Sequence, residues 1–386
     1  MTLYTYLYNN DVNSPTYEKD LTRDVGPLRI LWEIPGGVQA IEFEYGANAQ
    51  NAYDFYSDNI GKRIIVLDKF LDRPVAEGWI YGITISPAGC RILCRGPWFR
   101  HFDEIDDTAY SLNQTSSAII KSSLTNHVPV ISSDQSHIQE TSFTLQADGT
   151  WHLSDYGLYP GDLIVKLAAM SNSDLNQWNY WVQSDMMDGV MPQKPLAYFE
   201  EQVNDGTFHW QITKADIGGN GITMERSIED FASAVLVLYR DIAGNEQSLT
   251  TWATNTDAAN TFWTREIILS GGQMVPDGAE QYRDLTLDKL SSPTLRRAFV
   301  ISSRRIMDNN GALWPLWYPI KNGGGYLRVN DLYPSAELLD LSLDSKRIGQ
   351  IMTAEYDGAN HTLRVSLDMT DDRADALMAQ MGVLNA

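Results

Sequence analysis

Short segments with the alternation of a β-strand recur about every 10 to 15 residues through the first hundred residues of the chain. Residues 40–45 place apolar side chains between glutamates, which is the period-2 pattern of a strand with one face in water. Residues 63–68, 75–85 and 90–94 continue the series, with Gly, Pro and Asp between the segments. Chains with many short strands at such spacing fold into barrels or sandwiches, so the sequence predicts a mainly β protein.

A few short helices interrupt the strands. Residues 116–124 and 276–290 are predicted to be helical, and a third helix is predicted from Pro160, because Pro suits the first turn of a helix. A last helix is predicted over residues 371–384. The apolar stripe of the third helix consists of Leu163, Ile164, Leu167 and Met170.

Two strand signals mark the second half of the chain. Residues 234–239 form a continuous apolar run, which predicts a strand buried on both faces. Residues 351–356 and 362–367 are joined across Asp357-Gly358-Ala359-Asn360, which predicts a β-hairpin.

The length of 386 residues corresponds to two or three domains at about 150 residues each. We expect a mainly β fold with a few short α-helices (α+β), built as two small β-barrel-like domains with inserted helical and β segments. The predicted division has four parts: an N-terminal barrel over residues 1–110, an inserted α/β domain over residues 111–200, a second barrel-like domain over residues 201–330, and a C-terminal hairpin and helix over residues 331–386.

The sequence indicates synthesis in a reducing compartment. The first residues lack the basic start and apolar run of a secretory signal, and no apolar stretch reaches the roughly 20 residues of a membrane helix. Cys90 and Cys94 lie four apart on a predicted strand, roughly 13 Å at about 3.3 Å per residue, which is too far for a disulfide. We therefore expect two reduced, buried thiols and no membrane anchor.

The charge balance argues against a conventional DNA-binding protein. Asp and Glu number 50 against 29 Lys and Arg, which gives a formal net charge of −21. Such an excess of carboxylates opposes attraction to phosphate backbones and to anionic lipid surfaces.

No motif in the sequence indicates catalysis or a cofactor. The six histidines are scattered without the spacing of a zinc site. Paired acids such as Glu42 and Glu44 could serve a glycosidase, but such pairs arise by chance among 50 carboxylates. The glycine-rich segments 218–221 and 323–325 lack the context of a phosphate loop, and no nucleophile-elbow motif occurs. We expect no enzyme activity, no metal and no cofactor.

Two aromatic groups are the candidate interaction residues. They consist of Trp178 and Trp181 in one segment, and of Trp314, Trp317 and Tyr318 in another. Such rings could form a sugar-stacking platform, although large aromatic side chains also supply most of the burial in β-rich cores and subunit contacts. Both interpretations stay open from the sequence, and these five residues are our candidates for a partner interface.

The order of these elements resembles that of the tail hub proteins (baseplate hub or tail-tip proteins) of long-tailed bacteriophages. The early barrel of that family is similar to residues 63–68 followed by 74–80. The helix near residues 163–170 followed by residues 178–182, and residues 325–334 followed by the hairpin at 355–367, also resemble the family. Together these segments cover about three quarters of the chain.

The resemblance implies a β-rich structural protein without enzymatic activity in its core. It implies a trimer, in which each chain contributes two related small barrels and the ring offers pseudo-sixfold symmetry to a sixfold tail tube. The partners would be the tail tube, the distal tail protein and a central spike or fibre. DNA would be only a passing cargo in the channel, where the acidic excess would keep it from sticking. The protein would be made and assembled in the host cytoplasm and would reside at the tail tip of the virion.

Alternatives of other kinds remain. A distal tail ring protein would assemble as a hexamer, and a carbohydrate-binding or receptor-binding tail protein would use the Trp clusters as stacking surfaces. A glycosidase or a peptidase is the third class.

Overall fold

The computed structural model describes residues 3–46, 54–55, 57–68, 70, 73–86, 89–111, 114–139, 150–152, 159–169, 178–187, 191–201, 207–218, 223–227, 231–241, 243–273, 276–291, 294–330 and 348–367. The chain is mainly β with a few short helices, as the sequence predicts. The helix predicted over residues 371–384 lies outside the described residues.

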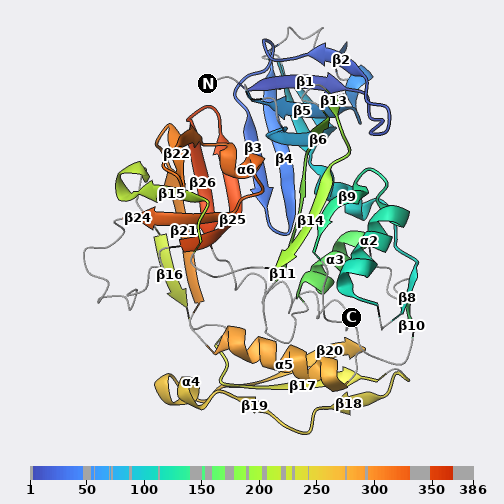
Figure 1. Ribbon diagram of the computed structural model, residues 1–386, viewed down its shortest axis with the longest axis vertical. Helices are drawn as coiled ribbons and strands as arrows, with labels where there is room; N and C mark the ends of the chain where they lie inside the picture. Colours follow the sequence, from blue (N-terminus) through green and yellow to red (C-terminus); the bar gives the residue numbers. More distant parts are fainter. Residues whose placement is uncertain are drawn as a thin grey trace.

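The first part of the chain is an antiparallel arrangement of seven strands (Figure 1). On β4, the side chains of Ile41, Phe43 and Tyr45 are buried, whereas Glu42 and Glu44 on the opposite face reach water. Cys90 and Cys94 of β7 are free thiols buried in the same core, because residues four positions apart on a strand lie on the same face. The strands are β1 (Tyr4–Tyr8), β2 (Tyr17–Asp20), β3 (Arg29–Glu33), β4 (Gly36–Tyr45), β5 (Arg63–Leu67), β6 (Ala76–Ser86) and β7 (Gly89–Arg95).

The middle of the chain adds a helical layer beside β11 and β14. Helix α2 begins after Thr115, whose hydroxyl caps it by accepting from the amide of Ala118 at 3.3 Å. Helix α3 begins at Pro160, as predicted. The elements are η1 (Pro97–Phe102), β8 (Ala109–Ser111), α2 (Ser116–His127), β9 (Ser132–Ile138), β10 (Thr150–His152), α3 (Pro160–Ala169), β11 (Trp178–Gln183), β12 (Met186–Met187), β13 (Met191–Pro192) and β14 (Leu196–Glu201).

The remaining strands form a second group that joins the first edge to edge. The predicted hairpin is present as β25 and β26, and β25 also pairs antiparallel with β3, so that residues from both ends of the chain lie in one sheet. The elements of this group are β15 (Trp210–Thr213), η3 (Lys214–Asp216), β16 (Thr223–Ser227), β21 (Thr294–Ile301), β22 (Arg305–Asp308), β23 (Leu313–Pro315), α6 (Tyr318–Lys321), β24 (Tyr326–Asn330), β25 (Ile348–Asp357) and β26 (Thr362–Leu367).

A small unit is inserted into this second group. Helix α5, predicted from the sequence with the same bounds, covers one face of a four-stranded sheet (Figure 1). The prediction that the run beginning at Ala234 is buried on both faces is wrong. Leu238 of β17 and Ile268 of the adjacent β20, which pairs with Leu236, are exposed on the face away from α5. The elements are β17 (Ala234–Arg240), β18 (Glu246–Ser248), β19 (Ala253–Thr254), α4 (Thr256–Thr261), β20 (Glu266–Gln273) and α5 (Pro276–Leu290).

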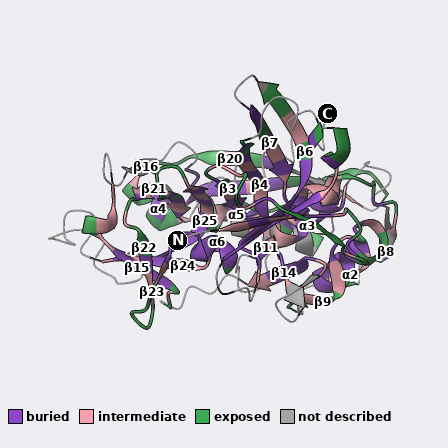
Figure 2. Ribbon diagram, turned by 90° about the horizontal axis from the view of Figure 1, so that it is seen from above, coloured by how far each residue is buried: buried purple, intermediate pink, exposed green. Residues whose placement is uncertain are grey.

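Three large hydrophobic clusters follow from this arrangement. The largest unites side chains from residues 7–94 with side chains from residues 210–367. A second lies between α2, α3, η1, β11 and β14, and a third lies under α5. Figure 2 shows buried segments running through the middle of the molecule, where β4, β11 and β25 lie. Within the described ranges, no helix is long and apolar enough to cross a membrane.

Candidate functional site

The first predicted aromatic pair lies on β11, between two hydrophobic clusters. Trp178 is 3% exposed and stacks on Phe199 of β14, with ring centroids 4.8 Å apart. Trp181 lies three positions later on the opposite face of the strand, is half-buried, and stacks on Tyr198 at 5.1 Å. The pair therefore does not form one platform, because its two rings point to different cores.

The second aromatic group lies at the start of α6. Trp317 and Tyr318 are 4% and 7% exposed, and Trp314 is half-buried and stacks on Tyr318 at 4.5 Å. The indole N–H of Trp317 is directed to the carboxylate of Asp68, 3.4 Å away. Trp178, Trp317 and Tyr318 thus pack within the chain. The predicted partner interface then depends on the half-buried rings of Trp181 and Trp314.

An exposed apolar surface does continue from Trp314. Phe70, 46% exposed, lies with its ring centroid 5.6 Å from that of the half-buried Trp314. Sequence reasoning missed Phe70 because it lies 244 positions before Trp314 in the sequence and no local pattern connects them.

Three consecutive glycines after α6 allow the backbone to approach Trp32 of the first group of strands and Trp210 of the second. Gly323, Gly324 and Gly325 have φ angles of +74°, +79° and +84°, which side chains rarely adopt. A Cβ on Gly324 would collide with the indole of Trp32, and the carbonyl of the same glycine accepts from the indole N–H of Trp210 at 2.8 Å. The glycine-rich segment that the sequence showed is therefore a turn, and its backbone contacts the aromatic core closely.

Two ion pairs are buried in this region. Asp68 and Lys321 are joined at 3.0 Å, and Arg63 and Glu77 are joined at 2.5 Å, with side chains at most 1% exposed. Arg63 also donates to the carbonyl of Gln193 at 2.5 Å. Since an unpaired charge in such surroundings is costly, both pairs fix the packing of the segments that carry them.

A buried histidine is held next to β11. The ring of His101 donates from Nδ1 to the carbonyl of Trp98 at 3.0 Å, because a carbonyl can only accept. Nε2 then accepts from the hydroxyl of Tyr180 at 2.7 Å. Burial lowers the pKa of His101 to about 3 and raises the pKa of Tyr180. This arrangement requires a neutral imidazole and serves packing.

One group of polar side chains has the residue types of a catalytic triad but a different geometry. The buried carboxylate of Asp106 accepts from the hydroxyl of Ser123 at 2.6 Å and from that of Tyr110 at 2.8 Å, and His127 Nε2 lies 3.1 Å from its other oxygen. In a triad the serine hydroxyl is hydrogen-bonded to the imidazole, which accepts its proton. Here the hydroxyl of Ser123 is engaged by the carboxylate instead.

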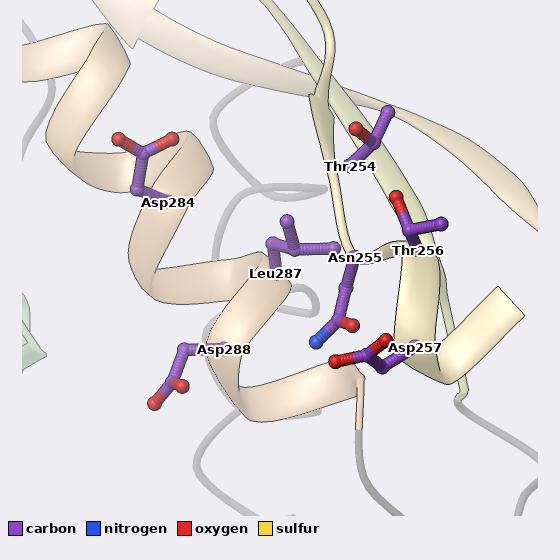
Figure 3. A pocket seen from close by; sticks show the side chains of 7 residues that line it. All are labelled: Thr254, Asn255, Thr256, Asp257, Asp284, Leu287 and Asp288. Carbon is purple, nitrogen blue, oxygen red and sulfur yellow. The ribbon is translucent and has the colours of Figure 1, made fainter.

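A cleft of about 450 Å³ lies between α4 and α5 in the small unit (Figure 3). Its lining includes the carboxylates of Asp257, Asp284 and Asp288, and Asp284 is paired with Arg283 at 2.7 Å. Across the part of the chain that the structure describes, no three His, Cys, Asp or Glu side chains are grouped to hold a metal ion.

The fold is similar to that of tail proteins of known structure. A 43-kDa tail protein of prophage MuSo2 from Shewanella oneidensis is 13% identical, with 96% of this chain and 98% of that chain covered and a TM-score of 0.56. A tail protein from Neisseria meningitidis MC58 is 10% identical, with coverages of 95% and 96% and a TM-score of 0.56. Prophage tail protein gp18 from Listeria monocytogenes EGD-e is 11% identical, with both chains covered completely and a TM-score of 0.52.

Sequence comparison adds nothing to this likeness: no protein-family description matches the chain, and no curated protein matches it. At 10–13% identity the likeness concerns the fold. The chain therefore has a fold similar to that of these phage tail proteins, and the mainly β fold with a few short helices expected from the sequence is confirmed.

Proposed function

We propose that this protein is a structural component of a phage tail, forming the hub or baseplate at the distal end of the tail tube. The observation that carries the proposal is the two-way coverage. In each of the three comparisons, at least 95% of this chain matches at least 96% of a tail protein. A likeness of this extent includes the inserted units as well as the sheets, so it does not come from one common small domain.

The proposed assembly is a trimeric ring. Its support is the division of the chain into two groups of strands. One group contains β4 and the other contains β25, and β3 pairs with both of these strands. We propose that the barrel-like domain over residues 1–110 and the one formed by residues 201–330 together with the C-terminal hairpin occupy equivalent places in the ring, so that three chains offer six similar positions. Closure after three copies requires a heterologous interface between neighbours.

The proposed partners are other tail proteins: the tail tube, the distal tail protein and a central spike or fibre. The protein would work by assembly and without catalysis, would be located at the tail tip of the virion, and would be assembled in the host cytoplasm. The surface formed by Phe70 and Trp314 is the proposed contact for one of these partners or for a neighbouring copy. Aromatic side chains of this kind are enriched in interface cores.

The particle mass tests this proposal. A trimer of the 43.4-kDa chain has a mass of about 130 kDa, and a hexamer has about 260 kDa. Light scattering coupled to size-exclusion chromatography measures the mass of the particle and distinguishes the trimer and the hexamer from the single chain. A trimer supports the hub, a hexamer supports a distal tail ring, and a monomer that stays monomeric when mixed with tail tubes contradicts both.

A further inference from the structure

The strands β6 and β7 form a hairpin whose far end extends beyond the body of the molecule (Figure 2). On one side, β4 pairs with β7 along the length of that strand. On the other side, β5 pairs with β6 only along residues 76–79. Among the strands that the structure describes, residues 81–86 of β6 therefore pair with β7 alone, and their outer edge faces away from the sheet.

The hairpin and the helix η1 that follows it are basic, although the chain is acidic. No Asp or Glu occurs from residue 78 to residue 102, whereas this segment contains Arg91, Arg95 and Arg100. The whole chain has 50 acidic residues and a formal net charge of −21. The projecting hairpin thus belongs to a basic region on the surface of an acidic molecule.

Arg95 differs from the other two arginines in its contacts. Arg91 is paired with Glu42 at 2.5 Å, and Arg100 is paired with Asp103 at 2.8 Å. Within the described ranges, no carboxylate is paired with Arg95. Its charge is therefore the one of the three that the chain leaves for another molecule.

Two aromatic rings hold the Arg95 guanidinium in place. Its central carbon lies 3.8 Å from the ring centroid of Tyr81 and 4.2 Å from that of Phe99. The two rings are inclined at 71° to each other, so the guanidinium lies in the corner that they form. A ring attracts the charge but leaves the N–H donors, whose planar fork matches the two oxygens of a carboxylate. Because the group is already held, it loses little freedom when a carboxylate binds.

Apolar side chains surround this guanidinium. Tyr81 is 53% exposed, and Leu93, on the same face of β7 as Arg95, is half-buried. The residue paired with Leu93 on β6 is Gly82, where an added Cβ would meet no atom within 4 Å. We call the surface formed by Tyr81, Leu93, Arg95 and Phe99 the Arg95 patch. Its combination of arginine with aromatic side chains is typical of the residues that dominate binding at protein interfaces.

A protein carboxylate suits this patch better than a nucleic acid does. The net charge opposes the approach of a polyanion, and a single unpaired guanidinium among apolar side chains offers a phosphate backbone only one contact. An acidic protein surface would pair with Arg95 and cover its apolar neighbours. The chain itself carries such surfaces, and a closed ring joins two different surfaces of the same chain.

We propose that the Arg95 patch binds an acidic surface of a neighbouring copy of the chain, and that Arg95 is paired there with a carboxylate of that copy. The inference rests on the proposed function, because it requires a ring of identical chains. It deepens that function by assigning one side of the contact between neighbours and the chemistry of the other side.

Removing the charge tests the pairing. The concentration at which half of the chains are assembled is measured by sedimentation for the unmodified protein, for Arg95→Gln and for the control Arg240→Gln, at an exposed position of the small unit. We expect Arg95→Gln to raise this concentration by at least about ten-fold, because a carboxylate would be left buried without its partner. Arg240→Gln should not change it.

A steric variant tests the location. Gly82→Tyr adds a side chain beside Leu93, in space that is open in the single chain, and should also weaken assembly by at least about ten-fold. The control Ser248→Tyr adds the same side chain at an exposed position of β18 and should not. Urea unfolding at a dilution where the chains are separate should give similar midpoints for all variants, which distinguishes a lost contact from a damaged fold.

The outcomes separate the inference from the proposed function. Rings that form equally well in Arg95→Gln and in Gly82→Tyr would overturn the inference and leave the ring intact. The same follows if the variants form rings but no longer bind tail tubes, because the patch would then contact a different tail protein. An unmodified chain that stays monomeric at every concentration and with tail tubes would remove both.

Discussion

The carboxylate of Asp68 lies 3.0 Å from the ammonium group of Lys321, although the two residues are 253 positions apart in the sequence. Both side chains are 1% exposed, and Lys321 also lies 4.9 Å from the ring centroid of Tyr318. Asp68 follows β5 in the first group of strands, and Lys321 ends α6 in the second group. This buried ion pair is thus one of the interactions that join the two halves of the chain.

Removing one partner of this pair should destabilise the protein. We expect Asp68→Ala or Lys321→Ala to lower the free energy of unfolding by about 3–5 kcal/mol, because the remaining charge stays buried without its partner. Urea unfolding followed by tryptophan fluorescence measures the change. The control is Lys62→Ala, which breaks the half-exposed pair with Glu18 and should cost about 0–1 kcal/mol. Equal losses for Lys321→Ala and Lys62→Ala would contradict the buried pair.

Gly324 should not tolerate a side chain. Gly324→Ala combines a φ angle of +79° with a collision against Trp32, and we expect it to cost more than about 2 kcal/mol. Gly311→Ala is the matched control, because its φ is +85° but no atom lies within 4 Å of the added Cβ. That control should cost about 1–2 kcal/mol, from backbone strain alone. Thermal unfolding of both variants provides the comparison, and equal melting temperatures would refute the close approach of the turn to the core.

Acid should destabilise the protein through His101. Burial lowers its pKa to about 3, whereas the unfolded chain has an ordinary value near 6.5. The folded state therefore binds fewer protons, and the stabilisation by the neutral ring is present above pH 6.5. It is lost as the pH falls from about 6.5 toward about 3, by up to about 1.4 kcal/mol for each pH unit.

Denaturant unfolding at several pH values measures this dependence. In His101→Gln the contribution should vanish, so its unfolding free energy should vary less between pH 6.5 and pH 4 than that of the unmodified protein. His361→Gln, at an exposed position, should keep the original slope. A slope unchanged by His101→Gln would show that other groups cause the pH dependence.

Substitutions of Trp314 and Trp317 should distinguish a packing role of these side chains from a sugar-binding role. Trp317→Ala removes a buried ring and should cost about 3–5 kcal/mol, while Trp314→Ala, at a half-buried position, should cost less. Retention on glycan columns is measured for the variants that still fold. If the unmodified protein is retained on a glycan column and both substitutions abolish that retention, the result would favour a carbohydrate-binding tail protein. Loss of folding or assembly would instead favour the interpretation that these rings pack in the core.

Local patterns sufficed for much of the fold. The alternation of Glu42 and Glu44 with apolar neighbours, the turn at Asp357-Gly358 and the proline at the start of α3 each depend on a few adjacent residues. Such signals are readable because the side-chain periods of strands and helices are fixed by backbone geometry.

Long-range relationships were not readable. The pairing of β3 with β25, the ion pair of Asp68 with Lys321 and the contact of Phe70 with Trp314 connect segments separated by more than two hundred residues. The face of Leu238 was mispredicted because a continuous apolar run has no periodicity that tells an exposed face from a covered one. The burial of the Trp317 ring against residues of the first group of strands was likewise not readable, and its contact with a partner stays a prediction.

The most direct test of the central claim is the rotational symmetry of the assembled particle in electron-microscopic class averages. The hub predicts a ring that repeats three times around a central channel, with six similar densities at the level of the two groups of strands. A ring of six identical chains would point to the distal tail ring instead. Particles with no rotational symmetry, even when tail tubes are present, would contradict the assignment to a tail hub.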